Sequence, residues 1–204
     1  MSNIKNIIFD LGNVLLNIDY NKTVEAFEKL GFDDFKTGFS PNNMGDLFKK
    51  LETGSISEAT FYQSIKDISK RPLNNTDIKN AWNALLLNFR TESLVFLEKM
   101  AKTHKLYLLS NTNSIHLTAF NQIFIRDTGK PSLDAYFTKT YYSNIIGLRK
   151  PDEEVYVYVL KDAAVNAAET LFIDDLAINT EAAKQLGIQT HLLLQHQTVE
   201  NINL

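Results

Sequence analysis

The sequence predicts an α/β fold in which a parallel sheet core carries an inserted helical subdomain. The first observation is a set of short apolar runs separated by helical patterns, at 4–9, 105–109, 138–142, 170–173 and 190–194. Strands that alternate with helices indicate βαβ units around a parallel sheet. The second observation is a stretch of about 70 residues, between the first and second runs, that has helical spacing and no clear strand pattern.

The run at 4–9 is mainly apolar and ends at Asp10, which is typical of a strand buried on both faces of a parallel sheet. The later runs predict the other strands in the same way, with 138–142 the weakest of them. Between them, apolar residues recur at helical spacing in 91–100, 155–164 and 178–186. Gly187 follows the last of these segments, where a glycine commonly ends a helix.

The segment 17–90 contains several helical patterns and turn signals. Apolar residues recur in 24–30, 47–51, 61–68 and 78–85, and Gly31, Gly54 and Pro72 interrupt the series. Since a βα connection normally takes only a few residues, the surplus is expected to form its own small subdomain. We therefore expect residues 17–90 to form a helical cap and residues 1–16 and 91–204 to form the core.

Composition excludes several classes of function. The 204 residues include 21 basic and 24 acidic side chains, a net charge of −3, with no basic cluster, so we expect no nucleic-acid partner. The absence of cysteine excludes disulfides and thiolate metal sites. No apolar run approaches the roughly 20 residues of a membrane span, so we expect no membrane partner. Asp10 and Asp19 interrupt the apolar start, which is unlike a signal peptide, and a cytoplasmic location is expected.

Polar side chains stand at or just beyond the ends of the predicted strands. They are Asp10, Ser110, Lys150 and the pair Asp174 and Asp175. In open α/β sheets, ligands bind beyond the carboxyl ends of the strands. Asp10, Ser110 and Lys150 taken singly also suit turns and helix caps. Two adjacent carboxylates repel each other, however, so Asp174 and Asp175 indicate a nearby cation or lysine.

Together these residues form a complementary set for phosphoryl transfer. Asp10 with Asp174 and Asp175 offers oxygen ligands for a hard cation such as Mg²⁺. Ser110 and the backbone N–H groups that follow it suit phosphate oxygens, and Lys150 suits both the phosphate and the excess negative charge. An in-line nucleophile, a metal ion and donors around the phosphoryl oxygens are the parts that such a reaction needs.

The order of these segments resembles the haloacid dehalogenase-like (HAD) hydrolase superfamily. Four segments carry the resemblance, which spans essentially the whole chain: FDLGNVL, LLSN, RKP and FIDD. It implies a Rossmann-like core with a helical cap. The wording of the first two segments is most similar to bacterial sugar-phosphate phosphatases, including the glucose-1-phosphate phosphatase type. The implied activity is Mg²⁺-dependent hydrolysis of a small phosphorylated metabolite, with a sugar phosphate as the expected substrate.

The resemblance also implies a role for each site residue. Asp10 would be the nucleophile and would form an aspartyl-phosphate. Mg²⁺ would lie on Asp10, the main-chain carbonyl of Gly12 and the pair Asp174 and Asp175, of which Asp175 is the first choice as a direct ligand. Ser110 and the Asn111 amide would hold the phosphoryl group, and Lys150 would orient it. Asn179 would support the acidic pair.

Gly12 departs from the family pattern, which usually has a second Asp there as general acid–base. Such catalysis typically contributes about 10²- to 10⁴-fold to the rate. The substrate could have a good leaving group, such as an anomeric sugar oxygen. His116 or Asp19 could replace the missing acid, and His116 is also a candidate for substrate binding. Otherwise the protein would be a poor catalyst.

Other classes of function stay open at this point. A metal-independent haloacid dehalogenase is one alternative, although it has little use for two adjacent carboxylates. A non-catalytic or regulatory phosphate-ligand binder is another, because of Gly12. A phosphoacceptor receiver domain would have its acidic pair at the first strand, and here the order is reversed. Residues expected at the leaving-group pocket include Asp19, Tyr20, Phe39, Asn43 and Trp82, although helical spacing favours core packing for Trp82. The sequence leaves monomer and homodimer open.

Overall fold

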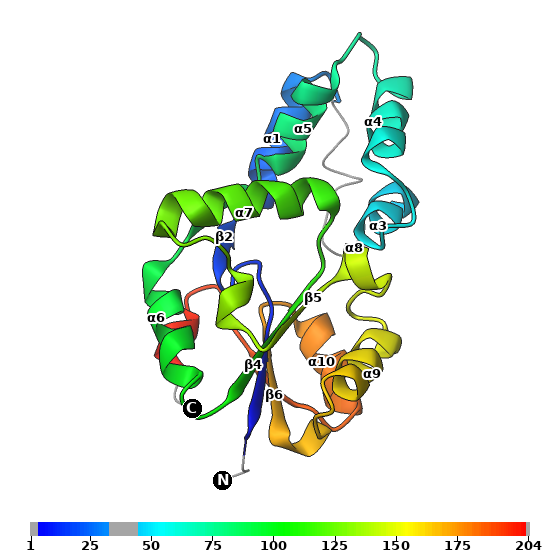
Figure 1. The fold of residues 1–204 in the computed structure, drawn as a ribbon. Coiled ribbons are helices and arrows are strands. Elements are labelled where there is room, and N and C mark those ends of the chain that lie inside the picture. Colours follow the sequence, from blue (N-terminus) through cyan, green and yellow to red (C-terminus); the bar gives the residue numbers. More distant parts are fainter. Residues whose placement is uncertain (1–3, 33–44, 203–204) are drawn as a thin grey trace.

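The computed structural model describes residues 4–32 and 45–202. Its centre is a sheet of five parallel strands in the order β5-β4-β1-β6-β7 (Figure 1). These strands are β1 (Asn6–Phe9), β4 (Lys105–Ser110), β5 (Lys139–Tyr142), β6 (Thr170–Asp174) and β7 (Gln189–Leu192). Each lies where an apolar run predicted it, so the α/β class and the parallel core are confirmed.

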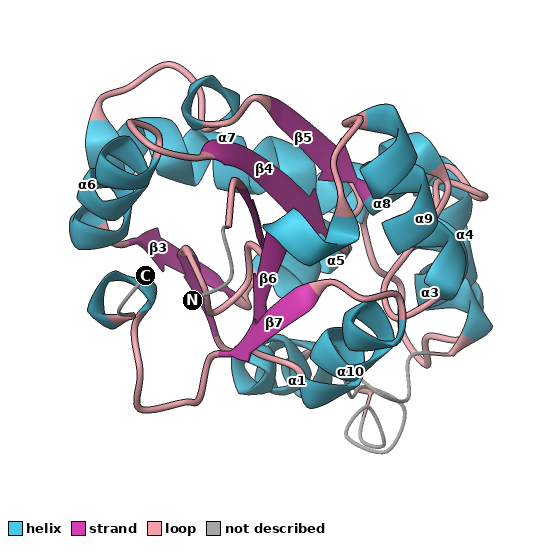
Figure 2. Cartoon of the chain, turned by 90° about the horizontal axis from the view of Figure 1, so that it is seen from below, coloured by secondary structure: helices cyan, strands magenta, loops and turns pink. Residues whose placement is uncertain are grey.

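Strands β1, β4 and β6 are buried on both faces because their alternate residues enter two different hydrophobic clusters. Ile7 and Phe9 pack in one cluster, with residues of α6 (Thr91–Met100) and α7 (Ser114–Thr128). Ile8 packs in the other, with residues of α9 (Glu153–Asp162) and α10 (Ala177–Gln185). Side chains of a strand point alternately to its two faces, so a continuous apolar run satisfies both layers. Figure 2 shows the helices on the two sides of the sheet.

Within the described ranges, five helices of the core surround this sheet, and three short 3₁₀ turns lie before β5, before β6 and after β7. The helices are α6 (Thr91–Met100), α7 (Ser114–Thr128), α8 (Ser143–Ile146), α9 (Glu153–Asp162) and α10 (Ala177–Gln185); the turns are Asp134–Tyr136, Ala167–Glu169 and Val199–Asn201. Among the described residues, no helix is both long enough and apolar enough to cross a membrane.

The helices between β2 (Leu16–Ile18) and β3 (Leu86–Phe89) pack around a hydrophobic cluster of their own. They are α1 (Tyr20–Lys29), α3 (Asp46–Glu52), α4 (Glu58–Asp67) and α5 (Asn75–Asn83), and Figure 1 shows them together at the upper end of the molecule. Phe27, Phe48 and Phe61 all contact the ring of Trp82, which is almost fully buried. Aromatic rings bury large areas and dominate such small cores.

The segment expected to hold no strand contains parts of a two-stranded antiparallel sheet. It pairs β2 (Leu16–Ile18) with β3 (Leu86–Phe89). The helical spacing at 78–85 hid β3, because α5 ends at Asn83 while apolar residues continue. The chain turns there, where the Thr23 hydroxyl donates to Trp82 O and accepts from Leu85 N. This ribbon joins the four helices to the parallel sheet.

Candidate active site

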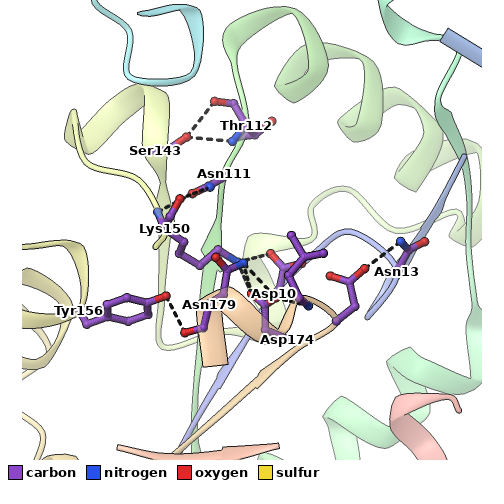
Figure 3. A network of polar contacts seen from close by, with 11 residues as sticks. Asp10, Asn13, Asn111, Thr112, Ser143, Lys150, Tyr156, Asp174 and Asn179 are labelled. Carbon is purple, nitrogen blue, oxygen red and sulfur yellow. Dashed lines mark hydrogen bonds and ion pairs between the residues drawn. The ribbon is translucent and has the colours of Figure 1, made fainter. Parts of the chain in front are cut away.

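Parallel pairing brings three of the predicted side chains to one edge of the sheet. Phe9 of β1 is in register with Leu108 of β4 and with Ile173 of β6. The residues at the carboxyl ends of these strands, Asp10, Ser110 and Asp174, therefore meet at one place. Figure 3 shows Lys150 reaching toward the same place from the segment before α9.

Lys150 forms a buried bridge between two carboxylates. Its Nζ lies 2.5 Å from Asp10 Oδ1 and 2.7 Å from Asp174 Oδ2, and its side chain is 2% exposed. Burial opposes the charge of the ammonium, but the two carboxylates outweigh burial and raise the pKa of Lys150 above its ordinary value. Burial raises the pKa of Asp10 to about 7, and Lys150 acts against that rise. A cation at this site therefore favours the ionised form of Asp10, which is the form that acts as a nucleophile.

Asp174 and Asp175 occupy different surroundings. Asp174 is fully buried and accepts hydrogen bonds from Asn179 Nδ2 at 3.0 Å and from Leu176 N at 2.8 Å. Asp175 lines the pocket and accepts a bond from Asn13 Nδ2 at 2.9 Å. Burial raises the pKa of Asp175, the Asn13 hydrogen bond lowers it, and the charge of Asp174 raises it again. Asp175 thus has fewer hydrogen bonds and more access than Asp174.

The three carboxylates fit a single divalent cation. One oxygen of each of Asp10, Asp174 and Asp175 can be chosen so that all three lie within 4.8 Å of one another. Oxygen ligands around octahedral Mg²⁺ are about 3 to 4 Å apart, since each lies about 2.1 Å from the ion. Hard oxygen donors in this arrangement suit Mg²⁺ better than a softer metal.

The loop after β4 is held by main-chain and side-chain hydrogen bonds. Ser110 is buried and lines the pocket beside Asp10. Asn111 lines the pocket, and its side chain also bonds to the main chain of Lys150. Its Nδ2 donates to Lys150 O at 2.8 Å, and its Oδ1 accepts from Lys150 N at 2.9 Å. Ser143 Oγ accepts from Thr112 N at 2.8 Å. The Asn111 side chain thus fixes Lys150, a contact between loops 39 residues apart that the sequence did not indicate.

Gly12 lines the same pocket. A Cβ placed on Gly12 would lie 3.9 Å from Asp10 Oδ2 and 2.9 Å from Ile18 Cδ1. The position thus faces the nucleophile candidate, as the resemblance implies, but glycine supplies no side chain there and the Ile18 side chain fills the adjoining space.

The two candidate substitutes for the missing acid, Asp19 and His116, occupy different places. Asp19 is the N-cap of α1, where its Oδ1 accepts from Asn21 N at 3.0 Å, and it is not among the residues that line the pocket. His116 does line the pocket and stacks on Trp82. Burial lowers the pKa of His116 to about 3, so the ring is neutral at neutral pH. Since Asn83 Oδ1 accepts from Nδ1 at 3.0 Å, Nε2 is an acceptor, suited to a substrate hydroxyl.

Other pocket residues come from both parts of the chain. Tyr20 and Trp82, two of the expected lining residues, do line it, whereas Phe39 and Asn43 lie outside the described residues. Glu52 and Arg149 line it as well and were not expected. Arg149 lies beside Lys150 in the RKP segment, and Asn13 lies in FDLGNVL, so their positions in these motifs could have indicated a place at the site. Glu52 carried none, because its partner is 97 residues away.

Comparison with known proteins identifies the family. A family model described as haloacid dehalogenase-like hydrolase matches residues 4–187. The chain belongs to the haloacid dehalogenase-like hydrolases. It is therefore an enzyme of the hydrolase class, and both the resemblance and the enzyme prediction are confirmed.

Relatives of this HAD-like hydrolase agree with the fold and with the expected cofactor. A curated relative, D-ribitol-5-phosphate phosphatase from Bacteroides thetaiotaomicron, is 35% identical over 92% of this chain and 90% of its own. A solved HAD family enzyme from that organism, in complex with magnesium and inorganic phosphate, has a TM-score of 0.89 and 34% identity, with 95% of this chain and 96% of that chain covered. The expected cofactor, Mg²⁺, is thus the ion bound in a similar structure.

Two further solved structures have lower identity, and the lower of the two supports the fold alone. L-2-haloacid dehalogenase from Xanthobacter autotrophicus is 17% identical, with a TM-score of 0.58 over 93% of this chain and 77% of that chain. A predicted HAD-like hydrolase from Porphyromonas gingivalis stands between, at 30% identity and a TM-score of 0.86 over 96% of this chain and 93% of that chain.

Proposed function

We propose that this HAD-like hydrolase is a magnesium-dependent phosphatase, which hydrolyses a small phosphorylated polyol or sugar through an aspartyl-phosphate on Asp10. The observation that carries the proposal is the cluster of Asp10, Asp174 and Asp175 around Lys150, at the floor of a pocket. A carboxylate nucleophile, a cation site and a fixed ammonium group are what phosphoryl transfer requires.

In the first step, a carboxylate oxygen of Asp10 attacks phosphorus, and the bond from phosphorus to the substrate oxygen breaks. The leaving alkoxide takes a proton and departs as an alcohol. In the second step, water attacks phosphorus of the acyl phosphate and releases inorganic phosphate, which restores the Asp10 carboxylate. Lys150 and Ser110 bind the phosphoryl oxygens during both steps. These two residues are well placed for this because both are buried beside Asp10.

Magnesium would be held by Asp10 and Asp175, by the Gly12 carbonyl, and by Asp174 directly or through water. When bound, it supplies positive charge that offsets the negative charge of the phosphoryl oxygens. The full hydrogen-bond complement of Asp174 favours Asp175 as the more available ligand.

We also propose that residues 17–90 act as a cap over a catalytic core made of residues 1–16 and 91–204. Tyr20, Glu52 and Trp82 of this segment line the pocket together with core residues. A cap in this position excludes water from the reacting groups and contacts the leaving group.

Polyol and sugar phosphates are favoured because the curated relative acts on D-ribitol 5-phosphate, as its name states. That compound leaves as a primary alcohol, which needs protonation more than an anomeric oxygen does. A polyol 5-phosphate and a hexose 1-phosphate therefore separate the two accounts of Gly12: efficient hydrolysis of the first requires a proton donor other than residue 12.

The two alternative functions, a haloacid dehalogenase and a regulatory phosphate binder, make different use of the acidic residues. A haloacid dehalogenase needs no metal, which leaves the pair Asp174 and Asp175 unexplained. A regulatory binder would bind phosphate without forming a covalent bond to Asp10.

The test is a panel of D-ribitol 5-phosphate, hexose 1-phosphates and hexose 6-phosphates, assayed for phosphate release with Mg²⁺ and with EDTA. We expect turnover that requires Mg²⁺. When a reaction with phosphate-labelled substrate is quenched in acid, Asp10 should carry the label. The Asp10→Asn variant should lose both. Asp19→Asn is the matched control, because Asn caps a helix as well as Asp does. Halide release from a 2-haloacid in EDTA, or full activity of Asp10→Asn, would contradict the proposal.

A further inference from the structure

A buried ion pair joins the helical segment to the core within the wall of the pocket. Glu52 is the last residue of α3, and Arg149 directly precedes Lys150. Arg149 Nε lies 3.1 Å from Glu52 Oε2, and the two side chains are only 14% and 10% exposed. Both residues line the pocket that contains Asp10. The roles proposed above for phosphoryl transfer use neither of them.

Glu52 is buried at a cost that Arg149 offsets. Burial raises the pKa of Glu52, while the charge and the hydrogen bond of Arg149 lower it again. A buried carboxylate without a partner would be strongly destabilising, so the pair acts as a unit. The charge of the pair is zero, and its remaining N–H groups and carboxylate oxygen are hydrogen-bonding groups that can serve hydroxyls.

An arginine that lines a phosphate pocket is ordinarily suited to bind a second anion. Its guanidinium group matches carboxylate and phosphate with two parallel hydrogen bonds. In the described part of the chain, the cationic residues that line this pocket are Arg149 and Lys150. Lys150 is engaged with Asp10 and Asp174, and Arg149 is engaged with Glu52. Each of these two cations is thus already paired with a carboxylate of the protein.

We infer that Glu52 determines substrate specificity: by pairing with Arg149, it limits the leaving-group side of the pocket to uncharged, hydroxyl-bearing groups. Phosphorylated metabolites with a second anionic group are rejected, because their carboxylate or phosphate would meet the Glu52 charge and a guanidinium already in use. Rejection of a competitor by like charge is a common source of specificity. The inference rests on the proposed phosphatase function and names the substrate class of that site.

The Glu52→Gln variant tests this assignment because glutamine keeps the shape and can still accept a hydrogen bond from Arg149. The measured quantity is kcat/KM for 3-phosphoglycerate divided by kcat/KM for D-ribitol 5-phosphate. Removal of the Glu52 charge should raise this ratio by about 10-fold or more. A Glu52→Gln, Arg149→Gln double variant should lose the gain, since Arg149 is the group that binds the added carboxylate.

The matched control is Glu98→Gln, which removes one carboxylate of an exposed ion pair with Lys130; neither residue lines this pocket. It should leave the ratio unchanged. Hydrolysis of p-nitrophenyl phosphate separates the two proposals, because its aromatic leaving group carries no second anion and needs little protonation. If no variant and no wild-type enzyme releases phosphate from it, the phosphatase proposal fails. If it is hydrolysed but Glu52→Gln leaves the ratio unchanged, Glu52 does not determine specificity.

The wild-type enzyme supplies a measurement that does not depend on folding of a variant. It should prefer D-ribitol 5-phosphate over 3-phosphoglycerate by at least about 10-fold in kcat/KM. Equal activity on the two substrates would overturn the assignment of Glu52, even if Glu52→Gln did not fold.

Discussion

The side chain of Asn111 forms two hydrogen bonds with the main chain of Lys150. Its Nδ2 donates to Lys150 O and its Oδ1 accepts from Lys150 N, at 2.8 and 2.9 Å. The resemblance led us to expect Asn111 at the phosphoryl group, and this contact gives its side chain a positioning role as well. Since Lys150 Nζ must reach both Asp10 and Asp174, the placement of its backbone decides the geometry of the whole cluster.

The Asn111→Ala variant should therefore misplace Lys150 without removing it. We expect a loss of about 10- to 100-fold in kcat/KM, because a displacement of about 1 Å at a reacting group can have such an effect. Steady-state kinetics at saturating Mg²⁺ measure the loss. Asn88→Ala, at an exposed asparagine on β3, is the control and should retain wild-type kinetics. Normal kinetics in Asn111→Ala would show that the two hydrogen bonds are dispensable.

Asn13 should control the affinity for Mg²⁺ through Asp175. Its Nδ2 donates to Asp175 Oδ2, and its backbone has a positive φ of 55°. Glycine adopts this backbone freely, so Asn13→Gly removes the hydrogen bond without strain. Loss of such a contact to a metal ligand typically weakens metal binding by about 10- to 100-fold.

The measurement is the Mg²⁺ dependence of phosphate release, together with calorimetric titration of Mg²⁺. The maximal rate at high Mg²⁺ should stay close to that of the wild type. Ala164→Gly is the matched control, since Ala164 also has a positive φ, of 51°, and lies outside the pocket. An unchanged Mg²⁺ affinity in Asn13→Gly would refute the role of Asn13.

His116 should make the folded protein sensitive to acid. Burial lowers its pKa from 6.5 to about 3, so the unfolded chain binds a proton between these values that the folded protein does not. The free energy of unfolding therefore falls as the pH drops from 6.5 toward 3, by about 2 kcal/mol at about pH 5. Above pH 6.5 the effect vanishes, because both states are then neutral.

Urea unfolding at about pH 7.5 and about pH 5 measures this effect. His116→Gln should lose less stability between the two pH values than the wild type does. His196→Gln, at an exposed histidine, should lose as much as the wild type. If His116→Gln showed the wild-type difference, the buried ring would not be the source of the acid sensitivity.

Gly54 should be essential to the contact between the helical segment and the core. A Cβ at Gly54 would lie 2.4 Å from the carbonyl oxygen of Asn144 in α8, and its φ is +66°. Gly54→Ala therefore adds a backbone clash to the strain of an alanine at positive φ. The strain alone costs about 1 to 2 kcal/mol, and overpacking typically adds about 1 to 3 kcal/mol.

Gly129→Ala isolates the strain, because Gly129 has nearly the same φ of +67° and has nothing within 4 Å of an added Cβ. The free energy of unfolding should fall more in Gly54→Ala than in Gly129→Ala. Of the two variants, only Gly54→Ala should also lose activity, because displacement of the segment would move Glu52, which lines the pocket. Equal stability losses in the two variants would mean that α3 and α8 separate without cost.

Several features of this hydrolase could be predicted from local sequence. The central strands were visible because burial on both faces demands mostly apolar residues, as at 7–9 and 170–173. Asp10 and Asp174 follow these runs, and they could be predicted as site residues because ligands bind beyond the carboxyl ends of the strands. The strand β3 was missed, because Leu85 and Leu86 continue a helical spacing that α5 leaves at Asn83.

The sequence by itself determined the class of chemistry: which acidic, hydroxyl and ammonium groups exist, and on which strand ends they lie. Only the tertiary structure decided their partners, since every decisive contact joins residues far apart in the chain. Lys150 contacts Asp10 across 140 residues, and Glu52 contacts Arg149 across 97. Burial decided their charges too, as His116 shows, because the desolvation that makes its ring neutral arises only when α5 and α7 pack together.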